Sequence, residues 1–231
     1  MEIGSEKWKQ LIIDGARDFD IHVDCNQAQQ LVIHALELLQ WNRKINLTAI
    51  TDPKEVAVKH FLDSIIPGHL LEPDATLLDI GSGGGFPGIP MKIMKPSLVL
   101  TLIDASRKKV SFLKHMIRTL KLEKVEARHV RAEDFIKERE VRNSFDVVVS
   151  RALASIEKLV TLAVPLLKQG GTIIALKGPE LHKELEAVWP QVDQNNGVME
   201  IAGIRFSVKF KRYSLPHLGL QRAIIALRIF S

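Results

Sequence analysis

Three alternating glycines follow an acidic residue in the order Asp79-x-Gly81-x-Gly83-x-Gly85. Glycine has no side chain, so such a loop lets a ligand come close to the backbone. A dinucleotide loop of the form G-x-G-x-x-G would need its third glycine where this chain has Phe86. An acid two residues before the first glycine instead favours S-adenosylmethionine, whose cationic half the carboxylate can face.

Further acidic residues stand where the next two strands are expected to end. Asp104 lies 19 residues beyond Gly85, at the place where an acid accepts both ribose hydroxyls of such a cofactor. Glu133 and Asp134 follow the third strand, where an acid commonly meets the adenine amino group. Helix capping is the alternative for this pair, as a turn role is for Asp79 and Asp104.

The residues after the fourth expected strand discriminate among methyl acceptors. The run Ser150-Arg151-Ala152-Leu153 lacks the N/D-P-P-aromatic motif that orients exocyclic amines. Carbon-5 methylation of pyrimidines needs a cysteine, and Cys25, the single cysteine, lies far outside this half of the chain. Guanine N7 remains, because its lone pair is exposed and needs no general base. Arg151 could bind guanine O6 or phosphate, or close the cofactor site; a surface ion pair is its alternative.

The elements that position these residues alternate between strands and helices. Helices over 106–121 and 155–168, with Ser106 and Ser155 as N-caps, separate some of the strands, which indicates crossover connections and a parallel sheet. The last two apolar runs have no helix between them and predict an antiparallel hairpin. The expected strands are 75–80, 98–104, 125–130, 145–150, 171–176, 204–213 and 221–230. This is the seven-stranded, mostly parallel α/β arrangement of the Rossmann-like class I methyltransferases.

The first third of the chain has helical periodicity and no strand signal. Helices are expected over 5–18, 27–41 and 53–66, with a polar stretch from Trp41 to Thr48 between the last two. We therefore predict a helical cap over residues 1–72 and a methyltransferase domain over residues 73–231.

Composition and charge narrow the class of protein. The 231 residues contain neither a long apolar run nor a signal-peptide pattern, and no Cys/His pair has zinc spacing. We therefore expect a cytoplasmic protein without a metal site. We also expect a monomer. Nine basic and two acidic residues lie in 105–131, and six basic and no acidic residues in the last 31. Two such segments suggest a polyanionic partner, with a solvated surface as the alternative.

Several stretches in the same order resemble one known family, the bacterial 16S rRNA guanine-N7 methyltransferases, formerly called glucose-inhibited division protein B. The resemblance covers roughly residues 27–230. It is strongest at Trp41-Asn42 through Asn46-Leu47-Thr48, His60-Phe61-Leu62-Asp63-Ser64, Asp79 through Pro90, Ser150-Arg151-Ala152 and Leu176-Lys177-Gly178.

This resemblance implies S-adenosylmethionine as cofactor and a guanine in the 530 loop of 16S rRNA, within the small ribosomal subunit, as acceptor. Three side chains of the cap, His60, Asp63 and Ser64, would border the guanine pocket with Arg151; an ion pair between His60 and Asp63 that only locks the cap is the alternative. The implied cofactor residues, with those expected from the loop itself, are Asp79, Gly81, Ser82, Gly83, Gly85, Phe86, Asp104, Ala105, Ser106, Ala132, Glu133 and Arg151.

Two other functions stay open at this point. A nicotinamide-dependent oxidoreductase would share the strand-loop-helix arrangement, although Phe86 breaks its loop pattern. A non-catalytic RNA-binding or ribosome-assembly factor would keep the basic segments and hold the cofactor only for stability.

Overall fold

A computed structural model describes residues 1–151, 155–178 and 197–230. Within these ranges eight strands form one sheet in the order β3-β2-β1-β4-β5-β8-β7-β6. Neighbours from β3 to β5 are parallel, and β5, β8, β7 and β6 are antiparallel to one another. The strands are β1 (Thr76–Ile80), β2 (Val99–Asp104), β3 (Val125–His129), β4 (Phe145–Arg151), β5 (Leu167–Lys177), β6 (Val198–Ile201), β7 (Ile204–Ser214) and β8 (Gln221–Ile229).

The predicted α/β fold with a C-terminal hairpin is therefore confirmed, with one strand more than the seven expected. The additional strand is β6, which pairs only with β7 at the edge of the sheet. Its four residues alternate between buried and more exposed side chains, a run too short to stand out in the sequence.

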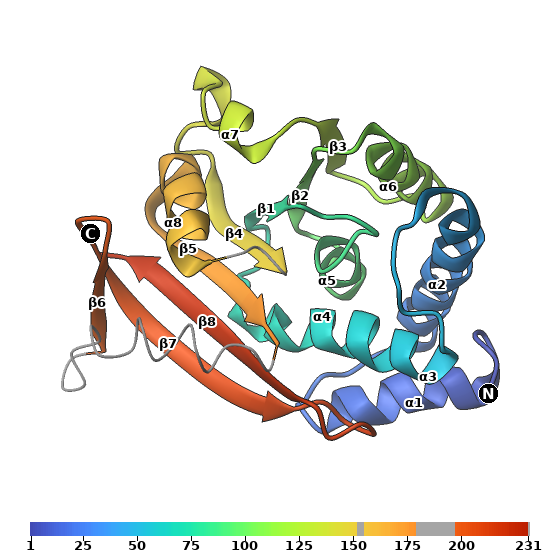
Figure 1. Ribbon diagram of the computed structural model, residues 1–231. Coiled ribbons are helices and arrows are strands. Elements are labelled where there is room, and N and C mark those ends of the chain that lie inside the picture. Colours follow the sequence, from blue (N-terminus) through green and yellow to red (C-terminus); the bar gives the residue numbers. More distant parts are fainter. Residues whose placement is uncertain (152–154, 179–196, 231) are drawn as a thin grey trace.

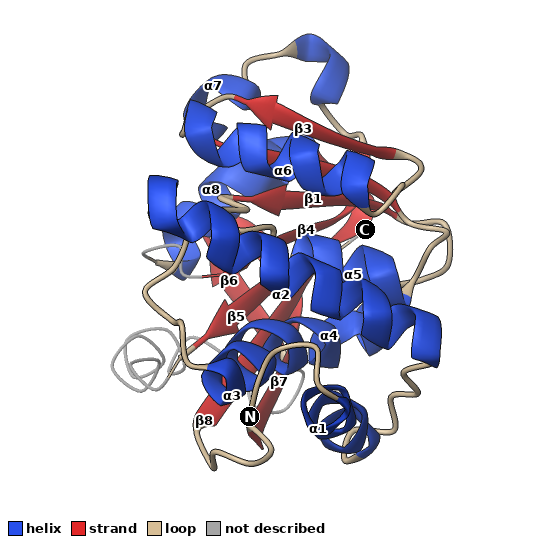
Figure 2. Ribbon diagram, turned by 90° about the vertical axis from the view of Figure 1, so that its right-hand side faces the viewer, coloured by secondary structure: helices blue, strands red, loops and turns tan. Residues whose placement is uncertain are grey.

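Helices cover both faces of the sheet. In Figure 1, α8 lies on one side of the strands and α5, α6 and α2 lie on the other. Figure 2 shows α2 and α6 together in front of the sheet. The helical segments are α1 (Glu6–Arg17), α2 (Cys25–Ile45), α3 (Pro53–Glu55), η1 (Val56–Leu62), α4 (Asp63–Ile65), η2 (Ile66–Leu70), α5 (Gly88–Met94), α6 (Arg107–Thr119), α7 (Ala132–Phe135), η3 (Arg139–Val141), α8 (Ile156–Ala163) and η4 (Val164–Leu166). No helix in the described ranges is long and apolar enough to cross a membrane.

Three helix ends differ from the predictions. The helix expected to end at Trp41 continues to Ile45 and stops at Asn46, whose left-handed conformation (φ 51°) is one that asparagine tolerates. The helix expected over 155–168 ends at Ala163, because Pro165 has no N–H with which to continue it. Ser155 caps that helix as predicted.

The third difference concerns the start of α6. Ser106 is the N-cap residue of α6 as predicted, but its hydroxyl makes no capping hydrogen bond. Instead the Ser106 N–H donates to Asp104 Oδ1 over 2.8 Å. The end of β2 thus determines where α6 begins.

The N-terminal helices and the sheet share one apolar core. Trp8, Leu31 and Phe61 of the helical part belong to the same buried cluster as Leu77 of β1 and Ile174 of β5. The predicted boundary between residues 72 and 73 falls in the connection between η2 and β1. Because the core crosses it, we expect the two parts to unfold together.

The Phe61→Ala variant tests this common core. Phe61 is fully buried and packs edge-on against Trp8 with ring centroids 5.7 Å apart. Its truncation should lower the free energy of unfolding by about 3–5 kcal/mol in one transition, measured in urea by both tryptophan fluorescence and circular dichroism. Leu36→Ala, at an exposed position of α2, is the control and should change stability by less than about 0.5 kcal/mol. Two separate transitions in the wild-type protein would contradict the prediction.

Candidate cofactor and acceptor site

A pocket of about 190 Å³ opens where three neighbouring strands end. Its apolar walls come from the ends of β1 and β2, from the residue after β3 and from α8; they are Ile80, Ile103, Val130 and Leu162. Asp104 and Glu133 add carboxylates to the lining. Carboxyl ends of parallel strands meet at one edge of an open sheet, which is where such folds bind ligands.

Five of the residues predicted to hold a cofactor line this pocket: Gly81, Asp104, Ala105, Ala132 and Glu133. Gly81 has a φ of 75°, and a side chain added there would meet no atom within 4 Å. Bare backbone thus borders open space at the start of the loop. Seven other predicted residues lie outside the lining: Asp79, Ser82, Gly83, Gly85, Phe86, Ser106 and Arg151.

Several of these seven residues give the loop its shape. Asp104 Oδ2 accepts a hydrogen bond from the Gly83 N–H (3.0 Å), while its Oδ1 binds the Ser106 N–H. The Ser82 hydroxyl donates to the carbonyl of Asp79, and the Gly85 N–H donates to the Ser82 carbonyl. Asp104 therefore both lines the pocket and ties the glycine loop to α6.

Asp79 lies directly beneath the loop and is fully buried. Its Oδ2 accepts the Gly88 N–H at 3.0 Å, and a side chain at Gly88 would come within 2.8 Å of that oxygen. Its Oδ1 has no hydrogen-bond partner among the described residues. Burial raises the pKa of Asp79 to about 7, against the opposing effects of the Gly88 bond and the Arg151 charge.

Arg151, at the end of β4, joins the sheet to the helical cap. Its Nη1 donates to the carbonyl of Lys59 (2.9 Å) and its Nη2 to Nδ1 of His60 (3.2 Å). The guanidinium carbon lies 5.0 Å from the centre of the Phe86 ring. We call Thr48, His60, Phe86 and Arg151 the cap lock.

The partners of His60 fix its protonation state. A guanidinium can only donate, so His60 Nδ1 carries no hydrogen. Burial and the nearby Arg151 charge lower the pKa of His60 to about 3, so the ring is neutral and its hydrogen is on Nε2. That N–H donates to Thr48 Oγ1 at 2.8 Å, and Thr48 Oγ1 also accepts the Ile50 N–H. Both ring nitrogens already take part in hydrogen bonds, so His60 has no free lone pair with which to accept a proton.

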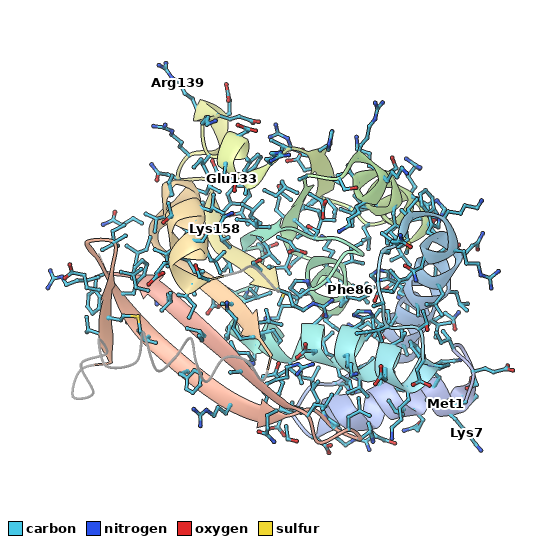
Figure 3. All side chains as sticks on the ribbon, viewed as in Figure 1. Met1, Lys7, Phe86, Glu133, Arg139 and Lys158 are labelled. Atoms are coloured by element: carbon cyan, nitrogen blue, oxygen red, sulfur yellow. The ribbon has the colours of Figure 1, made fainter. Side chains whose placement is uncertain are left out.

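An aromatic stack holds the glycine loop under the cap. The Phe86 ring lies nearly parallel to His60 at 4.5 Å and to His34 of α2 at 4.8 Å. His34 Nε2 donates to the carbonyl of Gly84 (2.8 Å). Figure 3 places Phe86 between the loop and the helices below it. Phe86, which stands where a dinucleotide loop needs glycine, is thus held by stacking against two histidines of the cap.

The other two predicted cap residues are interior and take different partners. Asp63 Oδ1 accepts the Tyr213 hydroxyl of β7 (2.7 Å), and its Oδ2 is 3.5 Å from Arg222 Nε of β8. The Ser64 hydroxyl donates to the His60 carbonyl. His60 and Asp63 do not pair, so the ion pair weighed as the alternative for them is wrong. Asp63 instead connects the cap to the C-terminal hairpin.

The acids after β3 belong to the first turn of α7, whose N-cap residue is Arg131. Glu133 is 3.1 Å from Lys158 Nζ of α8, and both residues line the pocket. Figure 3 shows the two between α7 and α8. Asp134 pairs with Lys137 and is not part of the pocket lining. Neither acid is the N-cap residue, but the Glu133 carboxylate accepts its own backbone N–H in this first turn, so the capping alternative survives in part for Glu133. Only Glu133 of the two lines the pocket.

Sequence reasoning gave no role to Thr48, Asn42 or His34. The first two belong to the stretch from Trp41 to Thr48, where Asn42 Oδ1 accepts the Thr48 N–H (2.9 Å) and so orients the loop. His34 falls on the buried face of α2, which is indistinguishable in sequence from an ordinary core position. Trp41 packs against Phe112 and His115 as a core anchor.

The remaining predictions concern metal sites and the residues that follow β4 in the chain. Among the residues that the structure describes, no three His, Cys, Asp or Glu side chains are grouped so as to hold a metal ion. Ala152 and Leu153, part of the run used to discriminate acceptors, lie outside the described residues.

Comparison with known sequences gives consistent matches. Residues 27–199 match the family GidB, described as rRNA small subunit methyltransferase G. The ribosomal RNA small subunit methyltransferase G of Alkaliphilus metalliredigens is 40% identical over 95% of this chain and 89% of its own length. That of Geobacter sp. strain M21 is 41% identical over 95% and 96%.

Solved structures show the same fold at low identity. A SAM-dependent methyltransferase from Aquifex aeolicus superposes with a TM-score of 0.55 at 18% identity, covering 80% of this chain and 97% of its own. M. jannaschii TYW2, solved in complex with AdoMet, gives a TM-score of 0.52 at 13% identity over 72% and 73%. At these identities the likeness concerns the fold alone.

The buried His34 predicts a specific loss of stability in acid. Burial lowers its pKa from 6.5 to about 4 in the folded protein, so the unfolded chain takes up the proton first. Its stabilising contribution is complete above pH 6.5 and is lost as the pH falls toward 4. Over these roughly 2.5 pH units the wild type should lose about 3 kcal/mol more than His34→Gln, measured by urea denaturation at each pH.

The control for this experiment is His22→Gln, at an exposed position before α2. It should follow the wild-type pH dependence. If His34→Gln and the wild type lost stability in parallel, the assignment of a neutral, buried His34 would be wrong.

Proposed function

This chain belongs to the GidB family, rRNA small subunit methyltransferase G, and we propose that it transfers a methyl group from S-adenosylmethionine to N7 of a guanine in 16S rRNA. The family match over residues 27–199 carries the proposal. The acceptor would be a guanine of the 530 loop in the small ribosomal subunit. We further propose that the chain works as a monomer in the cytoplasm, with the helical cap and the methyltransferase domain acting as one unit.

The pocket residues fit this cofactor. Four apolar side chains form walls suited to a flat adenine, and the Asp104 carboxylate is placed to accept ribose hydroxyls while it keeps its two loop bonds. Glu133 is available for the adenine amino group. The unpartnered Asp79 Oδ1 is an acceptor that a cationic amine or an ordered water near the loop would satisfy.

The bound cofactor would supply an electrophilic methyl group, and guanine N7 would form the new bond with its own lone pair as the carbon–sulfur bond breaks and sulfur keeps the electron pair. The chain then needs only to bind, orient and exclude water, because no proton has to leave N7 first. The committed state of His60 agrees with this chemistry, since it offers no free base. Arg151 would position the purine or the cofactor from the end of β4.

The two alternatives have less support. Membership of a methyltransferase family argues against an oxidoreductase, and Phe86 is gripped by two histidines where a dinucleotide loop needs glycine. A purely structural assembly factor is a testable alternative, because it would not depend on the residues around the reacting atoms.

Loss of the Asp104 charge should weaken cofactor binding. In Asp104→Asn the ribose hydroxyls and two loop amides lose a charged acceptor, so the Kd for S-adenosylmethionine should rise about tenfold, measured by calorimetry. Glu157→Gln makes the same charge change at an exposed position of α8 outside the pocket and should bind as the wild type does. Equal affinities for the Asp104 variant and the wild type would remove Asp104 from the site.

Methylation in cells separates an enzyme from an assembly factor. Mass spectrometry of nucleosides from digested 16S rRNA should find N7-methylguanosine with the wild-type gene and none after its deletion. Arg151→Ala should reduce the modification at least tenfold, because the cap lock loses both bonds of the guanidinium. Two results together would favour the assembly factor. The wild type would never methylate the rRNA, and cells with Arg151→Ala would grow and assemble ribosomes normally.

A further inference from the structure

One helix carries a row of basic side chains that no acid on the same helix balances. Arg107, Lys114 and Arg118 follow one another at i, i+7 and i+11 on the exposed side of α6, and Lys108 stands beside the first of them. All four are exposed, and the helix contains no Asp or Glu. We call these four residues the α6 stripe.

The stripe is unpaired within the described part of the chain. None of its four side chains makes an ion pair or a hydrogen bond there. Nearby basic residues differ, because Arg128 pairs with Glu138 and Lys137 with Asp134. Four unpaired cations on the exposed surface of one helix create a local positive potential that attracts polyanions.

The stripe begins at the cofactor pocket. Ala105, a pocket residue, and Ser106 come immediately before α6, so Arg107 stands at the pocket edge. Arg118 lies eleven residues beyond Arg107, so the stripe extends about 16 Å along the helix from that edge. Figure 2 shows α6 along the front of the molecule, with α2 below it.

Helix α2 holds the stripe in place and extends it. Trp41 packs against Phe112, and Glu37 Oε2 is 2.7 Å from His115 Nε2, so α6 is fixed along its length. The last turn of α2 adds two exposed basic residues, Arg43 and Lys44.

The second basic segment of the sequence does not form a comparable surface at the pocket. Lys209 and Arg228 line a groove with Asp74 and Asp146 at the opposite edge of the sheet, where the parallel strands begin. Arg205 lies beyond them on β7. Arg222 is turned inward toward Asp63. The structure thus separates two segments that looked equivalent in charge.

We propose that the α6 stripe binds the sugar-phosphate backbone of the rRNA strand that leads into the site. This inference rests on the proposed function, because it requires an RNA substrate at the pocket edge. Phosphate contacts of this kind position a strand without reading its sequence, and they release counterions. The strand would lie along α6 and present its guanine where β1, β2 and β4 end.

Two triple variants with the same charge change test the proposal. Lys108→Gln/Lys114→Gln/Arg118→Gln neutralises three of the four stripe residues and leaves Arg107 at the pocket edge unchanged. Arg205→Gln/Lys209→Gln/Arg228→Gln neutralises three exposed residues at the far edge. Binding to 16S rRNA, naked and in isolated small subunits, is measured between 50 and 300 mM salt. The wild type should lose affinity steeply as salt rises.

The stripe variant should bind about tenfold or more weakly at the lowest salt, with a slope of log K against log salt that is smaller by about 2–3. The far-edge variant should keep the wild-type slope. Both should keep the wild-type Kd for S-adenosylmethionine, which shows that the pocket is folded.

An unchanged slope for the stripe variant, or an equal reduction in both variants, would overturn the proposal. Failure of the proposed function has a different signature. A wild type that binds rRNA through the stripe but never methylates it would contradict the reaction and support the surface. A wild type that methylates normally, together with a stripe variant that binds rRNA as tightly as the wild type, would support the reaction and contradict the role of the stripe.

Discussion

The guanidinium of Arg151 is the interaction on which the arrangement of this site depends. It stands at the end of a central strand and contacts the Lys59 carbonyl, the His60 ring and the face of Phe86 at once. A partly buried cation tolerates such a position only when its donors are satisfied and opposite charges are near. Asp63 and Asp79 supply those charges from the cap and from the strand below the glycine loop. The cap, the loop and the sheet edge are therefore held by one group.

The glycine loop keeps its shape with few side chains of its own because neighbouring groups hold its backbone. Asp79 and Asp104 fasten it from below through backbone N–H groups, and His34 and Phe86 fasten it from the cap side. The backbone is held by its own polar groups, so few side chains are needed near the pocket. This leaves room beside Gly81 for a ligand while the loop keeps a defined shape.

Much of this molecule could be predicted from sequence because its signals are local. Periodicity predicted the five parallel strands and the terminal hairpin, and the spacing of Asp79, Gly81 and Asp104 pointed to the edge of the sheet where the pocket lies. Helix ends failed where a single backbone effect decided them, as at Pro165 and Asn46. Whether Phe86 faces a ligand or a histidine depends on residues about 50 and 25 positions away along the chain, His34 and His60, and no local pattern carries that information.

The order of the strands has a consequence for how the protein behaves in a crowded cell. A sheet with two free edges can pair with the edge of another molecule and aggregate. Here both outer strands are short, five residues in β3 and four in β6. Along β3 the side chains of Glu126, Arg128 and His129 place polar or charged groups at the edge. Such an edge disfavours the addition of a strand from another molecule, so the strands between the two edges can form a large apolar core without promoting aggregation.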